Sequence, residues 1–373
     1  VVSLDLSFIR QLKAPRSGYI TVAYKHALDK VPRGQAECQW YPPKDGTRPK
    51  AIVVFFPGMS DTRLYYHDCA DKFAGNPGLV EYYPPFLSKL QSLIPRSYGI
   101  LSMGHVGHSL SLSFQTQALT LNEQVLVKVD LVTKLRQEVD AWAQESGYEG
   151  APIQIGVMGH SVGAEIAVQT MRAVESESPS SAITAAFLLF PTLAHIARTP
   201  NALRLAPLFR SPLLELAPVL LMLFKPIFLL INLVYYLFPS TRNAQSSSIY
   251  APNPITVTML ETPIVVSHVL RLARSEMQTI RDPDLDWYRK NGQDGNGRVF
   301  SYWGANDGWV GREGDAVKVA LRGEQEQASA GEEVTRLIEC KDNIPHAFCL
   351  GEWLHSTLEQ GSFFASSQRL YRE

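Results

Sequence analysis

The stretch Pro152-Ile-Gln-Ile-Gly-Val-Met-Gly159-His160-Ser161-Val162-Gly163-Ala-Glu-Ile-Ala-Val-Gln169 is typical of a short apolar strand, a five-residue turn and the start of a helix. The turn, Gly159 to Gly163, fits the pattern G-x-S-x-G. A side chain at either glycine would collide with the neighbouring strand or helix, because the turn is sharp and strained. Such a turn raises the Ser161 hydroxyl above the edge of a sheet and points the Val162 N–H at a developing oxyanion. We therefore predict a nucleophilic serine, the alternative being a glycine-rich turn with an idle serine.

The rest of the chain predicts an α/β fold around this turn. Continuous apolar runs such as Ala51-Ile-Val-Val-Phe-Phe56 are typical of strands buried on both faces of a mainly parallel sheet. Strands that alternate with helices give βαβ units, with helices on both faces of the sheet. Because the sequence has no repeat and no low-complexity linker, we expect residues 1–373 to form one domain. Strands are expected at 18–28, 51–56, 98–104, 152–159, 182–190, 298–303 and 335–340, and helices at 81–93, 121–146, 263–277 and 311–321.

One apolar stretch interrupts this alternation. Within an insertion at 200–250, residues 213–238 are almost wholly apolar, and residues 216–238 carry a single charge, Lys225. The run has the length of a bilayer span, but Pro218 and Pro226 divide it into pieces of roughly 8 and 12 residues, each too short to span. We therefore expect two short apolar helices that enter one leaflet or a lipid monolayer and return. A buried lid and a simple transmembrane helix are the alternatives.

The composition argues against several other classes of protein. With 45% hydrophobic residues, 19% charged residues and a net charge of −1, the chain can build a large core and shows no sign of nucleic-acid binding. The histidines form no H-x-x-x-H pair on a helix-like segment, and the cysteines have no metal-ligand spacing, so neither a metal nor another cofactor is expected. The four cysteines are interpreted as buried thiols of a reducing compartment: Cys38, Cys69, Cys340 and Cys349.

A nucleophilic serine needs a base and an acid that orients the base, and in this type of fold both follow the serine along the chain. Asp307 lies in Gly304-Ala-Asn-Asp-Gly-Trp, after the expected strand that ends at Trp303. His346 lies in Asp342-Asn-Ile-Pro-His-Ala-Phe, after the expected strand that ends at Cys340. Both positions lie at the carboxyl edge of the sheet, where Ser161 also points. Asp307 and His346 are therefore the predicted partners of Ser161.

Other acids and histidines fit this role less well. Asp282, Asp284 and Asp286 have no strand before them, and His268 and His355 fall inside helical patterns. His160 is expected to line the pocket or to pack beneath it. Gly107-His108-Ser109 repeats part of the pattern, but Ser111 replaces the closing glycine.

The second oxyanion N–H is expected from the loop after the strand at 51–56. Two segments compete for this role. Pro57-Gly58-Met59 follows the strand directly, and Ala74-Gly75-Asn76-Pro77-Gly78 comes some sixteen residues later. The residues alone do not separate them.

Six motifs of the chain form a more specific set than the turn alone. They are Gly75-Asn-Pro-Gly-Leu-Val-Glu-Tyr-Tyr-Pro-Pro-Phe86, His105-Val-Gly-His108, Gly159-His-Ser-Val-Gly163, Leu188-Leu-Phe-Pro-Thr-Leu193, Tyr302-Trp-Gly-Ala-Asn-Asp-Gly-Trp309 and Ile344-Pro-His-Ala-Phe348. Together they resemble the lipid droplet-associated hydrolase family of the α/β-hydrolase superfamily, and its fungal members in particular. The resemblance covers most of residues 50–357. It implies an α/β-hydrolase fold with a catalytic triad of Ser161, Asp307 and His346. It also implies that the apolar stretch 213–238 attaches the protein to lipid droplets and the endoplasmic reticulum.

The chain departs from the family pattern at one place. The family runs its strand straight into P-G-N-P-G, whereas Phe56 is followed here by residues 57–72 before Phe73-Ala-Gly-Asn-Pro-Gly78. We interpret 57–72 as an insertion, with a retained intron as one possible origin. The family motif favours the N–H of Asn76 as the second oxyanion donor, with Gly58-Met59 as the alternative.

The sequence and the resemblance together predict a serine ester hydrolase of lipid droplets. Ser161 would attack an acyl ester of a neutral lipid, a triacylglycerol or a sterol ester, with His346 as base and Asp307 orienting it. The expected partners are the lipid substrate and the droplet monolayer or the cytoplasmic face of the endoplasmic reticulum, contacted through 213–238. Two alternatives stay open. One is an acyltransferase or thioesterase with the same triad, and the other is a non-catalytic scaffold on the droplet surface.

Overall fold

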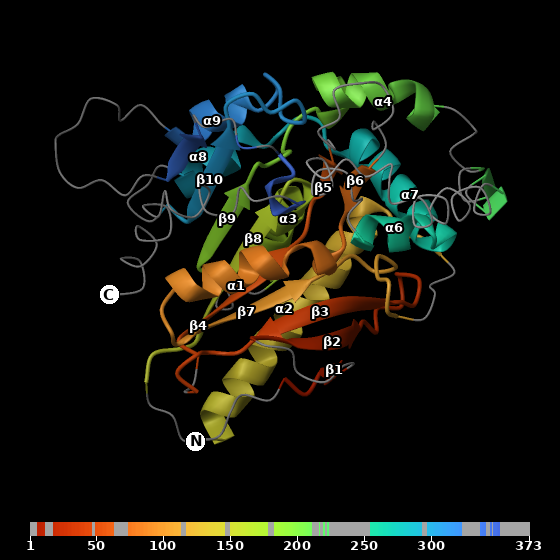
Figure 1. Cartoon of the computed structure of the whole chain (residues 1–373). Helices are drawn as coiled ribbons and strands as arrows, with labels where there is room; N and C mark the ends of the chain where they lie inside the picture. Colours follow the sequence, from red (N-terminus) through yellow and green to blue (C-terminus); the bar gives the residue numbers. More distant parts are fainter. Residues whose placement is uncertain are drawn as a thin grey trace, which may run out of the picture.

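The computed structural model describes residues 6–11, 18–46, 49–62, 74–112, 117–145, 150–177, 183–210, 216, 219–220, 222–223, 254–292, 297–322, 336–340, 344 and 346–350. Among these residues, a nine-stranded sheet has the order β1-β2-β3-β7-β4-β8-β9-β10-β11 (Figure 1). Its strands are β1 (Ile9–Gln11), β2 (Ile20–Lys25), β3 (Gln35–Tyr41), β4 (Ala51–Phe56), β7 (Tyr98–Met103), β8 (Gln154–His160), β9 (Ala185–Leu189), β10 (Val299–Gly304) and β11 (Leu337–Cys340).

The six strands from β7 to β11 in this order run parallel, and β1, β2 and β3 form an antiparallel edge beside β7. The predicted α/β class with a mainly parallel sheet is therefore confirmed. The expected strands are all present within one to three residues of the predicted bounds. Strands β1 and β3 of this sheet are additions that the sequence pattern did not predict.

Helices cover both faces of the sheet. The helices are α1 (Pro84–Leu93), α2 (Leu121–Glu145), α3 (Val162–Glu177), α4 (Pro200–Arg210), α6 (Pro254–Leu260), α7 (Pro263–Thr279), α8 (Leu285–Gly292) and α9 (Asp315–Arg322), and short 3-10 turns lie at Val80–Tyr82, Ile196–Arg198 and Phe348–Leu350. Alternate residues of β4 enter two separate cores: Val54 packs with α2 and α3, whereas Phe55 packs with α1. Because β4 is buried on both faces, its sequence is apolar at every position.

The segment after β4 forms a second, small sheet. Strands β5 (Met59–Thr62) and β6 (Ala74–Pro77) pair antiparallel, and Met59 lies opposite Pro77. The chain therefore returns to the point that it left, between Gly58 and Gly78. Most of the predicted insertion 57–72 lies outside the described residues, and its first part is β5.

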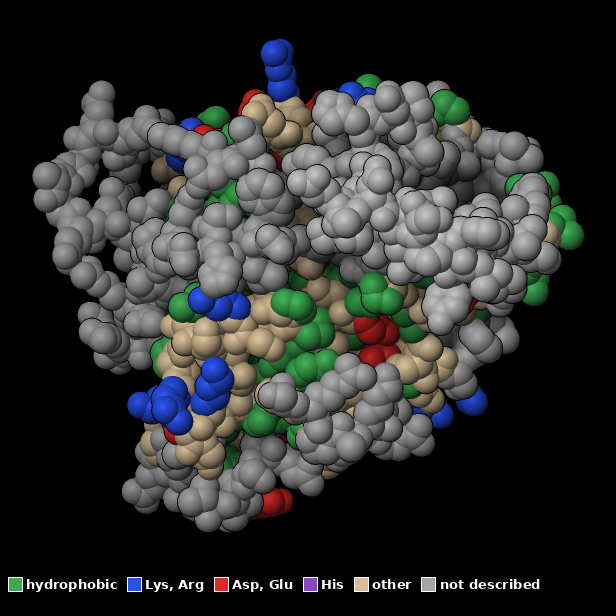
Figure 2. Space-filling view, in the orientation of Figure 1, with side chains coloured by type: hydrophobic (Ala, Val, Ile, Leu, Met, Phe, Trp, Pro, Cys, Tyr) green, Lys and Arg blue, Asp and Glu red, His purple; other side chains and the backbone are tan. Residues whose placement is uncertain are grey.

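The predicted apolar insertion is described at a few positions. Helix α4 begins the 200–250 segment, and residues 216, 219–220 and 222–223 are helical, while the rest of 213–238 lies outside the described residues. Large apolar side chains at these positions are exposed, with Met222 and Leu223 at 64% and 67%. Figure 2 shows apolar side chains gathered at the right-hand margin of the molecule, where Figure 1 places this segment.

Within the described part of the chain, no single helix is long and apolar enough to cross a membrane. Helices α6 and α7 together have the length and hydropathy of a span, but they are bent by 94° at the break between them.

Candidate active site

Ser161 lies at the carboxyl end of β8, directly before the first residue of α3. Its φ of 56° is in the left-handed region that a serine rarely adopts, which agrees with the predicted strained turn. Two backbone hydrogen bonds hold this conformation. The Ser161 N–H donates to the Leu189 carbonyl at 2.9 Å, and the Ser161 carbonyl accepts the N–H of Ala164 at 2.9 Å. Neighbouring elements therefore fix the nucleophile from both sides.

Both glycines of the turn are required by close backbone contacts. A Cβ on Gly159 would lie 2.0 Å from the carbonyl oxygen of Gly163. A Cβ on Gly163 would lie 2.2 Å from the carbonyl oxygen of Phe56, at the end of β4. Real Cβ contacts are essentially never this short. The turn can therefore form between β4 and α3 because these two positions lack side chains, as the sequence pattern predicted.

The three side chains predicted to act together meet at this turn. The Ser161 Oγ lies 2.8 Å from His346 Nε2, and His346 Nδ1 lies 2.5 Å from Asp307 Oδ2. A carboxylate accepts hydrogen bonds, so Nδ1 carries the ring proton and Nε2 is free to accept the serine proton. The side chains of His346 and Asp307 are 7% and 2% exposed, which shields their hydrogen bond from water. The arrangement has the connectivity of a Ser-His-Asp triad.

Asp307 is positioned by the turn that follows β10. Its Oδ1 accepts the N–H of Trp309 at 2.9 Å, and its carbonyl oxygen accepts the N–H groups of Val310 and Gly311. One carboxylate oxygen thus fixes the turn while the other faces His346. The Asn-Asp-Gly sequence suits such a turn, and here the turn chemistry and the site geometry use the same residue.

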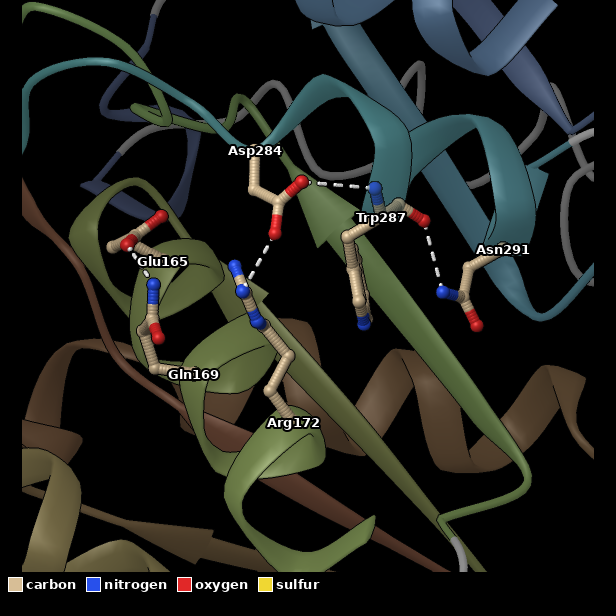
Figure 3. A network of polar contacts seen from close by, with 6 residues as sticks. All are labelled: Glu165, Gln169, Arg172, Asp284, Trp287 and Asn291. Carbon is tan, nitrogen blue, oxygen red and sulfur yellow. Dashed lines mark hydrogen bonds and ion pairs between the residues drawn. The ribbon is translucent and has the colours of Figure 1, made fainter. Parts of the chain in front are cut away.

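The acids that the sequence analysis set aside have structural partners elsewhere. Asp284 pairs with Arg172 of α3 at 2.7 Å and accepts the N–H of Trp287 at 3.1 Å, so it caps α8 and ties it to α3 (Figure 3). In the same view, Glu165 and Gln169 bond along α3 and the Asn291 amide bonds the Trp287 carbonyl, a further set of contacts within the two helices. Asp282 pairs with His195, and Asp286 pairs with Arg289.

The remaining histidine alternatives do not reach Ser161 by any contact that the structure describes. His268 is buried on α7 and packs against Gly107 and His108. His355 lies outside the described residues. Within the described ranges, no three His, Cys, Asp or Glu side chains are placed to hold a metal ion.

The segment that directly follows β4 is one of the two expected to supply the second oxyanion N–H. Gly58 lies against the turn, because a Cβ on it would be 2.5 Å from the Ser161 Cβ. Its N–H, however, donates to the Tyr83 hydroxyl at 3.0 Å. Asn76, the donor that the family motif favours, lies in β6 opposite Ser60. Val162, the predicted first donor, is the first residue of α3.

Two further side chains reach the site, and spacing alone does not assign their roles. His160 is fully buried, and its ring bonds both the Tyr83 hydroxyl at 2.8 Å and the His346 carbonyl at 2.8 Å. Burial lowers the pKa of His160 well below its ordinary value, and the nearby His346 adds to this effect. The sequence does not mark Tyr83 as a site residue, since its one signal is its place in the family motif at 75–86.

Known proteins place the chain in a family. A profile of the family described as lipid-droplet associated hydrolase matches residues 72–349, starting where the predicted insertion ends. The lipid droplet-associated hydrolase of Pongo abelii is 24% identical over 323 residues, which cover 86% of this chain and 85% of the relative. The Mus musculus protein of the same name is 23% identical and covers 82% of each chain.

Among solved structures, a membrane phospholipase A described as a bacterial virulence factor aligns with a TM-score of 0.51 and 11% identity, covering 95% of this chain and 88% of the other. At this identity the likeness concerns the fold alone. The chain belongs to the lipid-droplet associated hydrolase family and has the α/β-hydrolase fold.

Proposed function

We propose that this protein is a serine hydrolase that cleaves acyl esters of neutral lipids, triacylglycerols or sterol esters, at the surface of lipid droplets. The observation that carries the proposal is the continuous hydrogen-bonded series from Ser161 Oγ through His346 to Asp307. Its order along the chain is Ser, Asp, His, as in other hydrolases of this fold. The family name and the exposed apolar residues at 216, 219–220 and 222–223 support a lipid substrate.

The proposed mechanism of ester cleavage uses this series of side chains. His346 Nε2 takes the Ser161 proton while Oγ attacks the ester carbonyl carbon, and Asp307 stabilises the resulting imidazolium. The tetrahedral oxyanion accepts the Val162 N–H and a second N–H, which we assign to Asn76 with Gly58-Met59 as the alternative. His346 then gives its proton to the leaving alcohol, and an acyl ester of Ser161 remains. Water then attacks the acyl carbon while His346 Nε2 takes a proton from the water, and His346 returns this proton to Ser161 Oγ as the acyl–Oγ bond breaks and the fatty acid leaves.

The proposal is tested with a fluorophosphonate probe, which phosphonylates an activated serine. The wild-type protein should be labelled, whereas Ser161→Ala should not, and Asp307→Asn should label more slowly by about 10⁴-fold because the histidine tautomer is no longer fixed. Incubation with triolein and with cholesteryl oleate then identifies the ester class by the fatty acid released. Absence of labelling in folded wild-type protein would leave the fold as a scaffold on the droplet surface.

We further propose that residues 213–238 hold the protein on the droplet monolayer and on the cytoplasmic face of the endoplasmic reticulum. The exposed side chains of Leu216, Val219, Leu220, Met222 and Leu223 support this placement, because buried apolar area would favour transfer from water into lipid. Deletion of 213–238 should release a fluorescent fusion from droplets into the surrounding solution. A fusion that stays on droplets after the deletion would contradict the proposal.

A further inference from the structure

A buried series of hydrogen bonds joins the two sides of the site behind Ser161. It runs from the Gly58 N–H to the Tyr83 hydroxyl at 3.0 Å, from that hydroxyl to His160 Nδ1 at 2.8 Å, and from His160 Nε2 to the His346 carbonyl at 2.8 Å. We call this series the Tyr83–His160 chain. It begins at Gly58, two residues after the end of β4, and it ends on the backbone carbonyl of His346, the proposed base.

The direction of every bond in this chain follows from its last member. A carbonyl oxygen can only accept, so His160 Nε2 must carry a proton and donate to His346. A neutral imidazole has one ring proton, so His160 Nδ1 is an acceptor and the Tyr83 hydroxyl donates to it. The Tyr83 oxygen then accepts the Gly58 N–H. The lowered pKa of His160 agrees with a neutral ring.

Packing leaves the two rings little freedom to leave this arrangement. Tyr83 and His160 are both 0% exposed. Tyr83 packs on Phe55 with ring centroids 4.8 Å apart, and His160 packs on Phe348 at 4.9 Å. A rotation of either ring would leave buried polar atoms without partners, which is unfavourable.

We infer that Tyr83 and His160 are positioning residues, which hold the backbone of His346 and the backbone at Gly58 in fixed positions on either side of Ser161. This inference rests on the proposed serine hydrolase function. Neither residue touches the reacting atoms. Their effect is on distance, because a shift of about 1 Å between base, nucleophile and oxyanion donors lowers the rate by as much as about 100-fold.

Tyr83→Phe is the direct test, because it removes one oxygen and keeps the ring. The variant should be labelled by the fluorophosphonate probe, and should turn over p-nitrophenyl butyrate, about 10- to 100-fold more slowly, through kcat rather than KM. Tyr82→Phe is the matched control. Tyr82 is also buried, and its hydroxyl bonds Thr256 at 2.7 Å and takes no part in the Tyr83–His160 chain. The control variant therefore loses a comparable hydrogen bond and should keep the wild-type rate.

Two substitutions of His160 separate its two bonds. His160→Gln places an amide N–H near the original Nε2 and can still donate to the His346 carbonyl. His160→Asn reaches as far as Nδ1 and loses that donor. The inference predicts that His160→Gln retains at least tenfold more labelling activity than His160→Asn, given that both variants fold, as judged by near-ultraviolet circular dichroism. Equal rates in the two variants, or a wild-type rate for Tyr83→Phe, would overturn it.

An NMR measurement tests the hydrogen bonds of the Tyr83–His160 chain without relying on activity. In protein labelled with ring-¹⁵N histidine, His160 should show a protonated Nε2 and an unprotonated Nδ1 between pH 5 and pH 8, and Tyr83→Phe should shift the Nδ1 signal. A wild-type His160 protonated on Nδ1 would refute the bond directions whatever the activity. If the NMR pattern is as expected but wild-type protein is never labelled, the proposed hydrolase function fails, and the positioning role falls with it while the hydrogen bonds stand.

Discussion

Gly163→Ala should disable the site by displacing backbone and not by removing a functional group. The new Cβ would lie 2.2 Å from the Phe56 carbonyl oxygen and 2.8 Å from that of Pro57, whereas ordinary contacts begin at 3.4 Å. Helix α3 and the end of β4 must therefore separate by about 1.2 Å, since neither oxygen belongs to a side chain that could rotate away. We expect the free energy of unfolding to fall by about 1–3 kcal/mol, as for other overpacked cores. Labelling of Ser161 should slow by about 100-fold, because Val162 lies on α3 and the segment proposed to supply the second oxyanion N–H follows β4, so their separation displaces the two donors.

The assay is the second-order rate constant of fluorophosphonate labelling, measured per mole of folded protein. Gly99→Ala is the control, since its Cβ would lie 2.5 Å from the Trp40 ring at the amino end of β7, the edge of the sheet opposite Ser161. It should lower stability by a similar amount and leave the labelling rate within about threefold of wild type. Folded Gly163→Ala protein that is labelled at the wild-type rate would refute the reasoning.

Three further predictions concern buried charge and the segment after β4. Burial raises the pKa of Glu276 to about 8, so between pH 4.5 and pH 8 the folded state holds a proton that the unfolded state has lost. The free energy of unfolding therefore falls as the pH rises through this range. Urea unfolding between pH 5 and pH 8 should show that Glu276→Gln removes up to about 4 kcal/mol of this fall. Burial lowers the pKa of His105 well below 6.5, so stability falls as the pH drops below 6.5, and His105→Gln should make that slope shallower by about 1.4 kcal/mol per pH unit. Removal of residues 59–75, which joins Gly58 to Asn76, should leave a folded protein that the probe labels at least as fast as wild type. Loss of labelling would show that the removed segment is part of the site. The presence of this segment in all mature transcripts would exclude a retained intron.

The local pattern at Gly159–Gly163 carried most of what could be predicted. Its two glycines are required because the backbone of the turn and of the neighbouring strand β4 leaves no space for a Cβ at either position. A short motif can therefore predict this turn, since the residues that it contains decide whether the turn can form. Asp307 and His346 were also predictable, because each follows its own apolar strand and parallel strands end at the same edge of the sheet. For these residues the order along the chain fixes the position in space.

Strand β3 shows where this reasoning stops. Glu37 and Gln39 occupy its interior and are 1% and 2% exposed, so the strand lacks the apolar alternation that would have predicted it. Both side chains are satisfied by distant residues. Glu37 accepts the Ser109 hydroxyl at 2.6 Å and Gln39 donates to the Val80 carbonyl at 3.3 Å. A buried polar strand of this kind is stabilised by tertiary partners that no local pattern contains.

No local pattern predicts the positioning roles of Tyr83 and His160, because these roles also depend on tertiary partners. The nucleophile and the base therefore differ in how strongly the fold holds each of them in place. Ser161 is held by backbone hydrogen bonds to β9 and α3 and by glycine contacts with β4. Its strained φ costs about 1–3 kcal/mol and is maintained because these elements determine it several times over. His346 is held instead by side-chain bonds to Asp307 and His160. Substitutions of the buried residues that contact His346, such as His160, should therefore displace the base before they displace the nucleophile. A destabilised variant would still present Ser161 at the end of β8, with no base aligned to activate it.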